Sequence, residues 1–207
     1  FMLAGTGSDV GKSILAAAFC RILKQDGYHP APFKAQNMAL NSYATPEGLE
    51  IGRAQAVQAE AAGVPCHTDM NPLLLKPSSE HTSQVVLLGK PIGDRNAYEY
   101  FRKEGREELR KVVNESYNRL ATRYNPIVME GAGSISEINL RDVDLVNMPM
   151  AKHAGADVFL VADIDRGGVF ASVYGSILLQ TPEERSLIKG IIINKFRGDI
   201  RLFESGI

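Results

Sequence analysis

The sequence lacks most of the features that mark secreted, membrane-spanning and nucleic-acid-binding proteins. Two cysteines in 207 residues are too few for a disulfide framework, which fits a reducing cytoplasm. No apolar run approaches the roughly 20 residues that a transmembrane helix needs. The net charge of -1 provides no basic field for nucleic acid or for an anionic membrane. We therefore expect a cytoplasmic protein that binds neither nucleic acid nor membrane.

Cysteine and histidine also show no metal-type spacing. Cys20 falls inside an apolar helical pattern, which favours a buried and unreactive thiol. Cys66 precedes His67, and we interpret this pair as an incidental loop dipeptide rather than a nucleophile or a metal ligand. The histidines are scattered and are expected to be ordinary surface residues: His29, His67, His81 and His153.

Short apolar runs alternate with helical patterns along the chain. The predicted strands are Phe1–Ala4, Ala31–Phe33, Ile127–Met129, Val158–Ala162 and Ile191–Ile193, with a weaker one at Gln84–Leu88. The predicted helices are Lys12–Gln25, Leu49–Ala62, Tyr98–Arg123, Val143–His153 and Val169–Leu179. This alternation predicts an α/β fold, with a mostly parallel open sheet and helices on both faces, formed by residues 1–207 as a single domain. Because ligands bind at the carboxyl ends of such strands, the polar segments after them should meet in one crevice.

A glycine-rich loop, GTGSDVGKS at residues 5–13, lies between the first predicted strand and the first predicted helix. Backbone N–H groups in such a turn, together with the helix N-terminus, attract phosphate. Lys12 is expected at the β- and γ-phosphates and Ser13 at Mg²⁺. Five residues separate Gly5 from Gly11, one more than in the usual pattern G-x-x-x-x-G-K-[ST]. The alternative is a glycine-rich turn that only caps the helix.

The expected nucleotide-binding positions in this loop are Thr6, Gly7, Ser8, Asp9, Val10, Gly11, Lys12 and Ser13. Asp9 is open to two interpretations, contact with metal or water and capping of the helix start, and we favour capping or orientation. A second segment, VMEGAGS at residues 128–134, ends a strand in Glu130 before two glycines. Glu130 is expected to bind Mg²⁺ beside Ser13, and the alternative is a solvated strand end.

The loop GTGSDVGKS together with EGAGS resembles the dethiobiotin synthetase-like group of P-loop NTPases. Further segments narrow the resemblance to the cobyric acid synthase family over essentially the whole chain: PFKAQNMALNS at 32–42, EINLRDVDLVNM at 137–148, DIDRGGVFA at 163–171 and NKFRGD at 194–199. The first and third of these segments are specific. Dethiobiotin synthetase has a shorter Lys-Pro segment at the first place, and cobyrinic acid a,c-diamide synthase has a different sequence there.

The resemblance implies an ATP- and Mg²⁺-dependent ligase of cobalamin biosynthesis. Enzymes of this family convert peripheral carboxylates of a corrinoid, adenosylcobyrinic acid a,c-diamide, to carboxamides, through phosphorylation of the carboxylate and displacement of phosphate by ammonia. Ammonia comes from a C-terminal glutaminase domain, which this chain does not contain. Neither Cys20 nor Cys66 lies in a glutaminase-like setting, so we expect no glutamine hydrolysis from this chain. A homodimer is one oligomeric state that the sequence leaves open.

Polar residues after the second predicted strand are the candidates for substrate contact. Lys34 is the best second cation and could bridge the γ-phosphate and the incoming carboxylate, or it could be a solvated loop lysine. The side chains of Gln36, Asn37, Asn41 and Ser42 suit hydrogen bonds to carboxylates and amides at the corrin rim. The alternative is that they bond within their own Asx-type loop.

Two further groups follow later strands. Asp165 and Arg166 are candidate catalytic residues, because one aspartate after the strand, Asp163 or Asp165, could bind metal and Arg166 could bind phosphate or a carboxylate. The alternative is an Asp–Arg pair that only shapes the Gly167–Gly168 turn. Asn194 ends the last strand, where relatives of the resembled group read adenine with an asparagine amide.

Other activities remain in competition with the leading one. One is a related ligase, cobyrinic acid a,c-diamide synthase or a dethiobiotin synthetase-like enzyme. Another is a ParA/MinD-like regulatory ATPase, although such proteins carry a further lysine near the start of the phosphate loop. Leu3, Ala4, Gly5 and Thr6 precede Gly7 here, so that lysine is absent. The last is a nucleotide-binding module without activity of its own.

Overall fold

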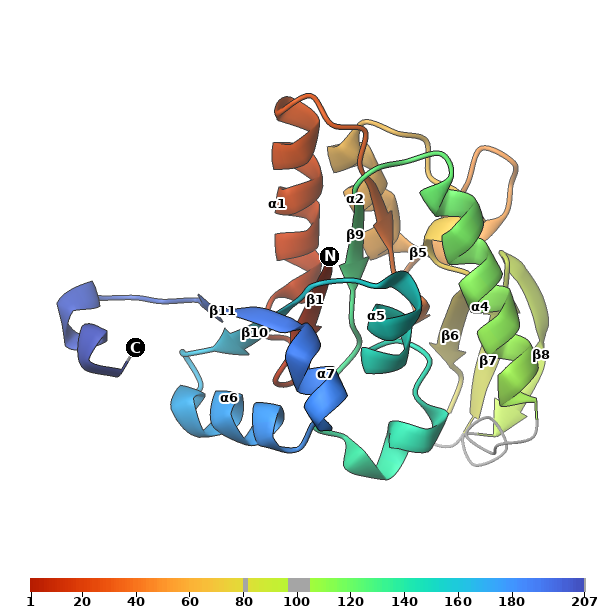
Figure 1. The fold of residues 1–207 in the computed structure, drawn as a ribbon. Helices are drawn as coiled ribbons and strands as arrows, with labels where there is room; N and C mark the ends of the chain where they lie inside the picture. The colour runs from red at the N-terminus through yellow and green to blue at the C-terminus, as the bar shows by residue number, and fades with distance from the viewer. Residues whose placement is uncertain (80–81, 97–104, 207) are drawn as a thin grey trace.

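A computed structural model describes residues 1–79, 82–96 and 105–206. At its centre is a five-stranded sheet of order β11-β10-β1-β9-β2, in which every neighbouring pair is parallel (Figure 1). Its strands are β1 (Met2–Gly5), β2 (Ala31–Phe33), β9 (Ile127–Glu130), β10 (Val158–Asp163) and β11 (Ile188–Asn194). The predicted mostly parallel α/β sheet is confirmed.

Helices pack on this sheet from both sides. They are α1 (Lys12–Gln25), α2 (Arg53–Ala62), α4 (Arg106–Ala121), α5 (Met148–Ala154), α6 (Val169–Leu178) and α7 (Pro182–Leu187). Helix α1 packs against α2, β1 and β9. Tyr117 of α4 meets Phe33 of β2 edge-on at 5.3 Å between ring centroids. In Figure 1, α4 and α5 lie in front of the sheet and α2 lies behind it.

The bounds of α1 match the prediction because local signals set both ends. Gly11 precedes the helix with φ of 101°, and Gly27 follows it with φ of 89°, a left-handed conformation that favours glycine. Ala16 and Cys20 are fully buried on the same face of the helix. Burial raises the pKa of the Cys20 thiol to about 12, so the prediction of a buried, unreactive cysteine is confirmed.

Two predicted helices begin later than expected. The helix predicted at Leu49–Ala62 starts at Arg53, because β5 (Glu50–Gly52) pairs with β4 (Ser42–Ala44) in an antiparallel ribbon. The helix predicted at Val143–His153 starts at Met148, after the 3₁₀-helix η2 (Ile138–Val143). The carboxylate of Asp144 accepts hydrogen bonds from the backbone N–H groups of residues 146 and 147, which forms a turn between the two helices. Of the helix predicted at Tyr98–Arg123, α4 is the described part, and residues 98–104 lie outside the described residues.

A second, mixed sheet has the order β3-β6-β7-β8 and was predicted only at its third strand. Its strands are β3 (Gln36–Met38), β6 (Leu73–Pro77), β7 (Thr82–Leu87) and β8 (Lys90–Asn96). Leu88 and Gly89 have φ of 47° and 78°, so a two-residue turn with both residues at positive φ joins β7 to β8. Strand β8 was missed because a sequence that contains Pro91 and Gly93 gives no apolar alternation.

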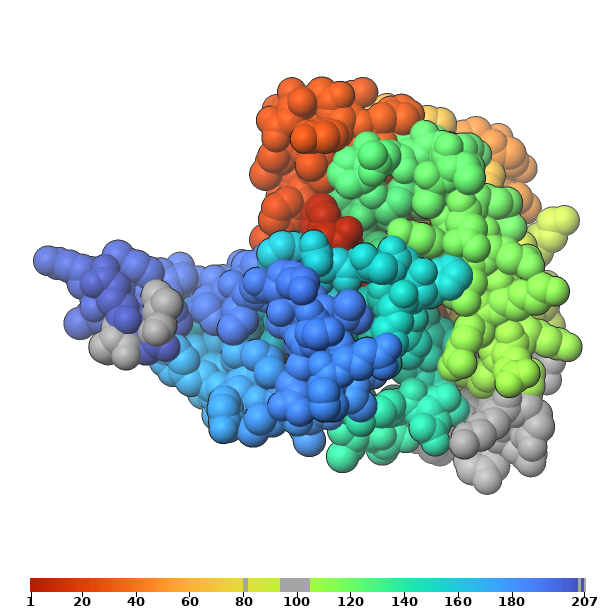
Figure 2. Space-filling view, in the orientation of Figure 1, coloured from red at the N-terminus to blue at the C-terminus, as the bar shows by residue number. Residues whose placement is uncertain are grey.

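The remaining elements are short. They are the 3₁₀-helices η1 (Thr68–Met70), η3 (Ile200–Leu202) and η4 (Glu204–Gly206). The segment after β11 extends away from the body of the molecule, as Figures 1 and 2 show. Phe203 of this segment stacks on Phe170 of α6 at 5.1 Å between ring centroids. Within the described residues, no helix has the length and apolarity to span a membrane.

Candidate functional site

A cavity of about 670 Å³ lies at the carboxyl ends of β1, β2 and β9. Residues at or after the ends of these strands line it, and they include three charged side chains: Lys12, Lys34 and Glu130. All three are buried, with exposed fractions of 6%, 8% and 2%. The prediction that polar segments after different strands converge on one crevice is therefore confirmed for these residues.

The glycine-rich loop wraps around the side chain of Lys12. The ammonium group donates hydrogen bonds to the carbonyl oxygens of Gly7 and Gly133, both at 2.8 Å. A Cβ atom at Gly5 would lie 2.5 Å from Nζ of Lys12, so any larger residue there would displace the ammonium group. The strand–loop–helix order and this geometry hold a cation at the mouth of a helix N-terminus, which is an arrangement that attracts phosphate.

The surroundings of Lys12 make its positive charge costly in the absence of an anion. Burial is the largest cause and the neighbouring ammonium group of Lys34 the second, and together they lower the pKa of Lys12 to about 8. The carboxylates of Glu130 and Asp9 act in the opposite direction. A phosphate that entered the cavity would reduce this cost, because it would place a negative charge beside both ammonium groups.

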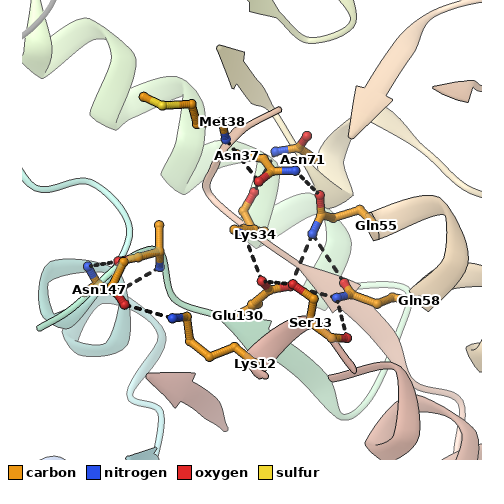
Figure 3. A network of polar contacts seen from close by, with 12 residues as sticks. Lys12, Ser13, Lys34, Asn37, Met38, Gln55, Gln58, Asn71, Glu130 and Asn147 are labelled. Carbon is orange, nitrogen blue, oxygen red and sulfur yellow. Dashed lines mark hydrogen bonds and ion pairs between the residues drawn. The ribbon is translucent and has the colours of Figure 1, made fainter. Parts of the chain in front are cut away.

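Glu130 connects three segments at the floor of the cavity (Figure 3). Its Oε1 accepts hydrogen bonds from the hydroxyl of Ser13 at 2.6 Å and from the ammonium of Lys34 at 2.7 Å. These contacts agree with two predictions. Ser13 and Glu130 were expected side by side, and Lys34 was expected to face the site. The alternatives of a solvated Glu130 and a solvated Lys34 are wrong, because both side chains are buried.

Two glutamines that were not predicted complete the surroundings of Glu130. Gln55 and Gln58 of α2 donate from Nε2 to Oε2 of Glu130 at 3.3 and 2.7 Å, and their exposed fractions are 0% and 1%. The available signal was their three-residue spacing on an alanine-rich helix, which puts both amides on the face that packs inward. Such amides need partners once buried, and Glu130 supplies them.

Asn147 lies in the segment EINLRDVDLVNM, and its side chain holds the loop after β9, a role that the sequence did not predict. Its side chain accepts from the N–H of Ala132 at 3.1 Å and donates to the carbonyl of the same residue at 3.0 Å. A Cβ atom at Gly131 would lie 2.5 Å from Oδ1 of Asn147, so a glycine is required at that position. This contact fixes the turn that presents the carbonyl of Gly133 to Lys12.

The donor atoms beside Lys12 fit Mg²⁺ rather than a softer metal. Ser13 and Glu130 offer a hydroxyl and a carboxylate oxygen, the hard ligands that Mg²⁺ prefers, in contact with the phosphate loop. Within the described ranges, no group of three or more histidine, cysteine, aspartate or glutamate side chains could hold a metal ion. The two oxygens suit an ion that is held jointly by the protein and by nucleotide phosphates.

The predicted substrate residues separate into two pairs. Gln36 and Asn37 line the cavity, and Asn37 donates from Nδ2 to Oε1 of Gln55 at 3.0 Å. Asn41 and Ser42 do not line it, because the antiparallel pairing of Ser42 with Gly52 turns this part of the chain away from the cavity. The four residues therefore do not form one loop, since Gln36 and Asn37 belong to β3 and Ser42 begins β4.

The residues after β10 form an ion-pair cluster beside the phosphate loop. Lys195 donates to Oδ2 of Asp163 at 2.7 Å, and this hydrogen bond is the largest cause that lowers the pKa of Asp163. Arg166 lies 3.4 Å from Asp163 and 3.9 Å from the exposed carboxylate of Asp9. Asp165 is half exposed and lies 4.0 Å from Arg197. Neither Asp165 nor Arg166 lines the cavity, so the structure does not bring them together with Lys12 and Lys34.

The capping role favoured for Asp9 is wrong. Gly11 occupies the N-cap position of α1, and no side chain caps that helix. The carboxylate of Asp9 is 85% exposed, and its backbone has a φ of 58°, which turns the chain without help from the side chain. The backbone of this residue is used instead, since the ammonium of Lys195 donates to its carbonyl oxygen at 2.8 Å.

The side chain of Asn194 contacts the phosphate loop, and Thr6 anchors the start of that loop to neighbouring segments. Asn194 donates from Nδ2 to the carbonyl of Val10 at 2.8 Å, and a Cβ atom at Gly11 would collide with this amide. Thr6 continues the hydrogen bonding of β1. Its N–H donates to the carbonyl oxygen of Val161, and its own carbonyl oxygen accepts from the hydroxyl of Ser134. The end of β11 is thereby tied to the loop that enters α1.

Comparisons with known proteins agree with this geometry. The family model of the CobQ/CobB/MinD/ParA nucleotide binding domain matches residues 1–207. Cobyric acid synthase of Bacteroides fragilis is 86% identical over 206 residues, and that of Parabacteroides distasonis is 67% identical over 206 residues. The matches cover 100% and 99% of this chain, and 42% of each relative, so the chain spans about two fifths of their length.

Among solved structures, the signal recognition particle receptor FtsY of Elizabethkingia anophelis matches with a TM-score of 0.46 and 14% identity, over 86% of this chain and 46% of that one. A likeness of this size carries no information on what this chain binds. The family model, by contrast, covers all the segments that build the cavity, from the phosphate loop to the end of β11. This chain belongs to the CobQ/CobB/MinD/ParA nucleotide-binding domain family.

Proposed function

We propose that this chain is the ATP-using synthetase part of a cobyric acid synthase. It would amidate peripheral carboxylates of adenosylcobyrinic acid a,c-diamide, with ammonia supplied by a glutaminase domain that lies outside this chain. The observation that carries the proposal is the convergence of Lys12, Lys34 and the Ser13–Glu130 pair on one cavity. The 86% identity to a cobyric acid synthase supports the choice of substrate class.

The proposed reaction has two steps. An oxygen of the substrate carboxylate attacks the γ-phosphorus of ATP, the bond to the β-phosphate oxygen breaks, and ADP leaves. Ammonia then attacks the carbonyl carbon of the acyl phosphate, a C–N bond forms, inorganic phosphate leaves with the C–O bonding pair, and the nitrogen loses a proton. Phosphorylation is needed because a free carboxylate repels nucleophiles and has no leaving group.

The residues of this chain would act mainly through position and charge. Lys12 would hold the β- and γ-phosphates from inside its loop, where it lies 2.8 Å from two backbone carbonyls in the free protein. Lys34 would turn from Glu130 toward the space between the γ-phosphate and the attacking carboxylate. Mg²⁺, held by Ser13 and Glu130, would neutralise phosphate charge when bound. Gln36 and Asn37 are the proposed substrate contacts that line the cavity.

Other residues proposed for the site do not line the cavity. Asp165 and Arg166 would need to move toward the cavity to act on substrate, because neither lines it. Asn41 and Ser42 would contact only the outer part of a large substrate such as a corrin. Asn194 would contact the adenine base from the far side of the phosphate loop, where its amide donates a hydrogen bond to the carbonyl oxygen of Val10.

An amidation assay tests the proposal. The chain is incubated with Mg-ATP, adenosylcobyrinic acid a,c-diamide and ammonium salt in place of glutamine, and new amides are sought by mass spectrometry. ATP-dependent amides support the synthetase assignment. Cobyrinic acid and the dethiobiotin precursor serve as competing substrates, and amidation or ATP turnover with one of these alone would favour the related ligases. Hydrolysis of ATP on a lipid surface without any amide would favour a ParA/MinD-like ATPase.

A further inference from the structure

The carboxylate of Glu130 uses each of its two oxygens for a different purpose. Oε1 faces the cavity, where it accepts from Ser13 and Lys34. Oε2 faces α2 and accepts from the amide groups of Gln55 and Gln58. A carboxylate that must present one oxygen to an ion needs the other oxygen held, because rotation about its last bond would exchange them.

Gln58 holds two parts of the site at once. Its Nε2 carries two hydrogens, and the amide nitrogen lies 2.7 Å from Oε2 of Glu130 and 3.2 Å from the carbonyl of Ser13. The residues it joins come from β9 and from the first turn of α1. Gln58 therefore joins the carboxylate of Glu130 to the backbone of Ser13, the two residues whose side chains fit Mg²⁺.

Gln55 links the same carboxylate to the segment proposed to contact substrate. Its Nε2 donates to Glu130, and its Oε1 accepts from Nδ2 of Asn37 at 3.0 Å. Asn37 therefore sets the orientation of the Gln55 amide, because the opposite orientation would bring two donors together. A Cβ atom at Gly52 would lie 2.5 Å from the Asn37 amide nitrogen and 2.6 Å from Oε1 of Gln55, so the backbone leaves space for this pair.

We propose that Gln55 and Gln58 are positioning residues that hold Glu130 in the orientation that binds Mg²⁺, and that Gln55 couples this orientation to Asn37. The proposal rests on the Mg-nucleotide site of the proposed function. Partners of this kind orient a metal ligand without touching the metal, and their loss typically lowers metal affinity by about 10- to 100-fold. Both amides are fully buried, and Figure 3 shows them on the side of Glu130 away from Lys12.

The test is a Mg²⁺ titration of nucleotide binding, followed with a fluorescent ATP analogue. Gln55→Met and Gln58→Met keep side-chain length and helix propensity but remove the amide. We expect the half-saturating Mg²⁺ concentration to rise about 10- to 100-fold, with nucleotide affinity in EDTA unchanged. Val113→Ala, a buried change on α4 outside the cavity, should lower thermal stability and leave the Mg²⁺ titration unchanged. Folded glutamine variants with the Mg²⁺ dependence of the unaltered chain would overturn the proposal.

A double-mutant cycle tests the coupling to Asn37. Asn37→Ala alone should raise the Mg²⁺ requirement, whereas Asn37→Ala combined with Gln55→Met should raise it no more than Gln55→Met alone. Additive effects of Asn37→Ala and Gln55→Met would overturn the coupling. If Gln58→Met does not fold, Gln58→Asn carries the same test, since its amide is one methylene too short to reach Oε2. An unaltered chain that binds no nucleotide would instead refute the proposed function.

Discussion

The ammonium group of Lys34 lies 2.7 Å from Oε1 of Glu130, and both side chains are buried at the floor of the cavity. Each residue ends or follows a different strand, so the ion pair exists only when β2 and β9 are paired. The same two groups are proposed to separate in function, with Lys34 moving to phosphate and Glu130 to Mg²⁺. Without bound nucleotide, each of the two buried charges thus neutralises the other.

Removal of Lys34 alone should destabilise the free protein. Lys34→Met leaves the buried negative charge of Glu130 without its ion-pair partner, and we expect the free energy of unfolding to fall by on the order of 3 kcal/mol. Chemical denaturation measures this loss. Glu130→Gln in the same chain is the matched control, because it removes the stranded charge and should restore part of the stability. A double variant less stable than Lys34→Met would contradict the importance of this ion pair.

Lys12→Ala should abolish Mg-ATP binding while the fold remains intact. The ammonium group is the part of the side chain that meets the carbonyls of Gly7 and Gly133, and the backbone of the loop turns at Asp9 and Gly11, which have φ of 58° and 101°. Calorimetric titration measures binding, and circular dichroism checks the fold. Lys24→Ala removes an exposed lysine at the other end of α1 and should bind ATP normally. Full ATP affinity in the Lys12→Ala variant would refute the nucleotide site.

Nucleotide affinity should depend on pH through Lys12. Its pKa of about 8 in the free protein means that the ammonium group deprotonates above pH 8, whereas bound phosphate favours the charged form. ATP binding above pH 8 should therefore take up a proton, and affinity should fall by up to about tenfold per pH unit. Titration calorimetry in buffers of different ionisation enthalpy counts the protons. Lys12→Arg, which stays charged, should lose this slope, and a pH-independent affinity of the unaltered chain between pH 8 and 9.5 would contradict the account.

The lowered pKa of Lys12 also makes the free energy of unfolding depend on pH. The pKa of about 8 in the folded chain lies below the ordinary lysine pKa of 10.5, so the unfolded chain binds more protons between these two pH values. The contribution of Lys12 to the free energy of unfolding should therefore increase as pH rises from about 8 to 10.5. Comparison of the unaltered chain with Lys12→Met across this range isolates the contribution. A free energy of unfolding of the unaltered chain that falls relative to that of Lys12→Met as pH rises would be the contrary result.

Asn194 offers a test of base recognition. Asn194→Asp replaces the amide that donates to the carbonyl of Val10 with a carboxylate, so one hydrogen bond to the loop is lost. We expect ATP affinity to fall about tenfold, in line with the loss of roughly 1.4 kcal/mol. Competition with GTP separates the two roles of this residue. A larger loss for ATP than for GTP supports contact with adenine, and equal losses would leave the loop contact as its only role.

Short sequence patterns predicted many of the backbone elements that surround the cavity. Glycines and apolar runs fixed the phosphate loop, α1 and β2, because these elements depend on neighbours in the sequence. Glu130 and Lys34 were found because each directly follows or ends an apolar strand. The sequence could not show that they pair with each other, since this requires the order of strands in the sheet.

Several predictions were missing or wrong for one physical reason: the contacts concerned join segments that are distant in the sequence. Gln55 and Gln58 appeared as ordinary helical residues, and only the packing of α2 against β9 and α1 makes them partners of Glu130. Ser42 was grouped with Asn37 because they are close in sequence, but the pairing of β4 with β5 separates them. Asp9 was expected to cap α1, but the helix begins two residues later and Gly11 occupies the N-cap position.

The most direct test of the account follows the carboxylate oxygen. The corrinoid substrate is labelled with ¹⁸O in its carboxylates and incubated with the chain, Mg-ATP and ammonium salt, and the released phosphate is analysed by mass spectrometry. Attack of the carboxylate on the γ-phosphorus predicts one ¹⁸O atom in each phosphate released with an amide. Amide formation with unlabelled phosphate, or with the label in AMP, would contradict the central claim that this site phosphorylates a carboxylate.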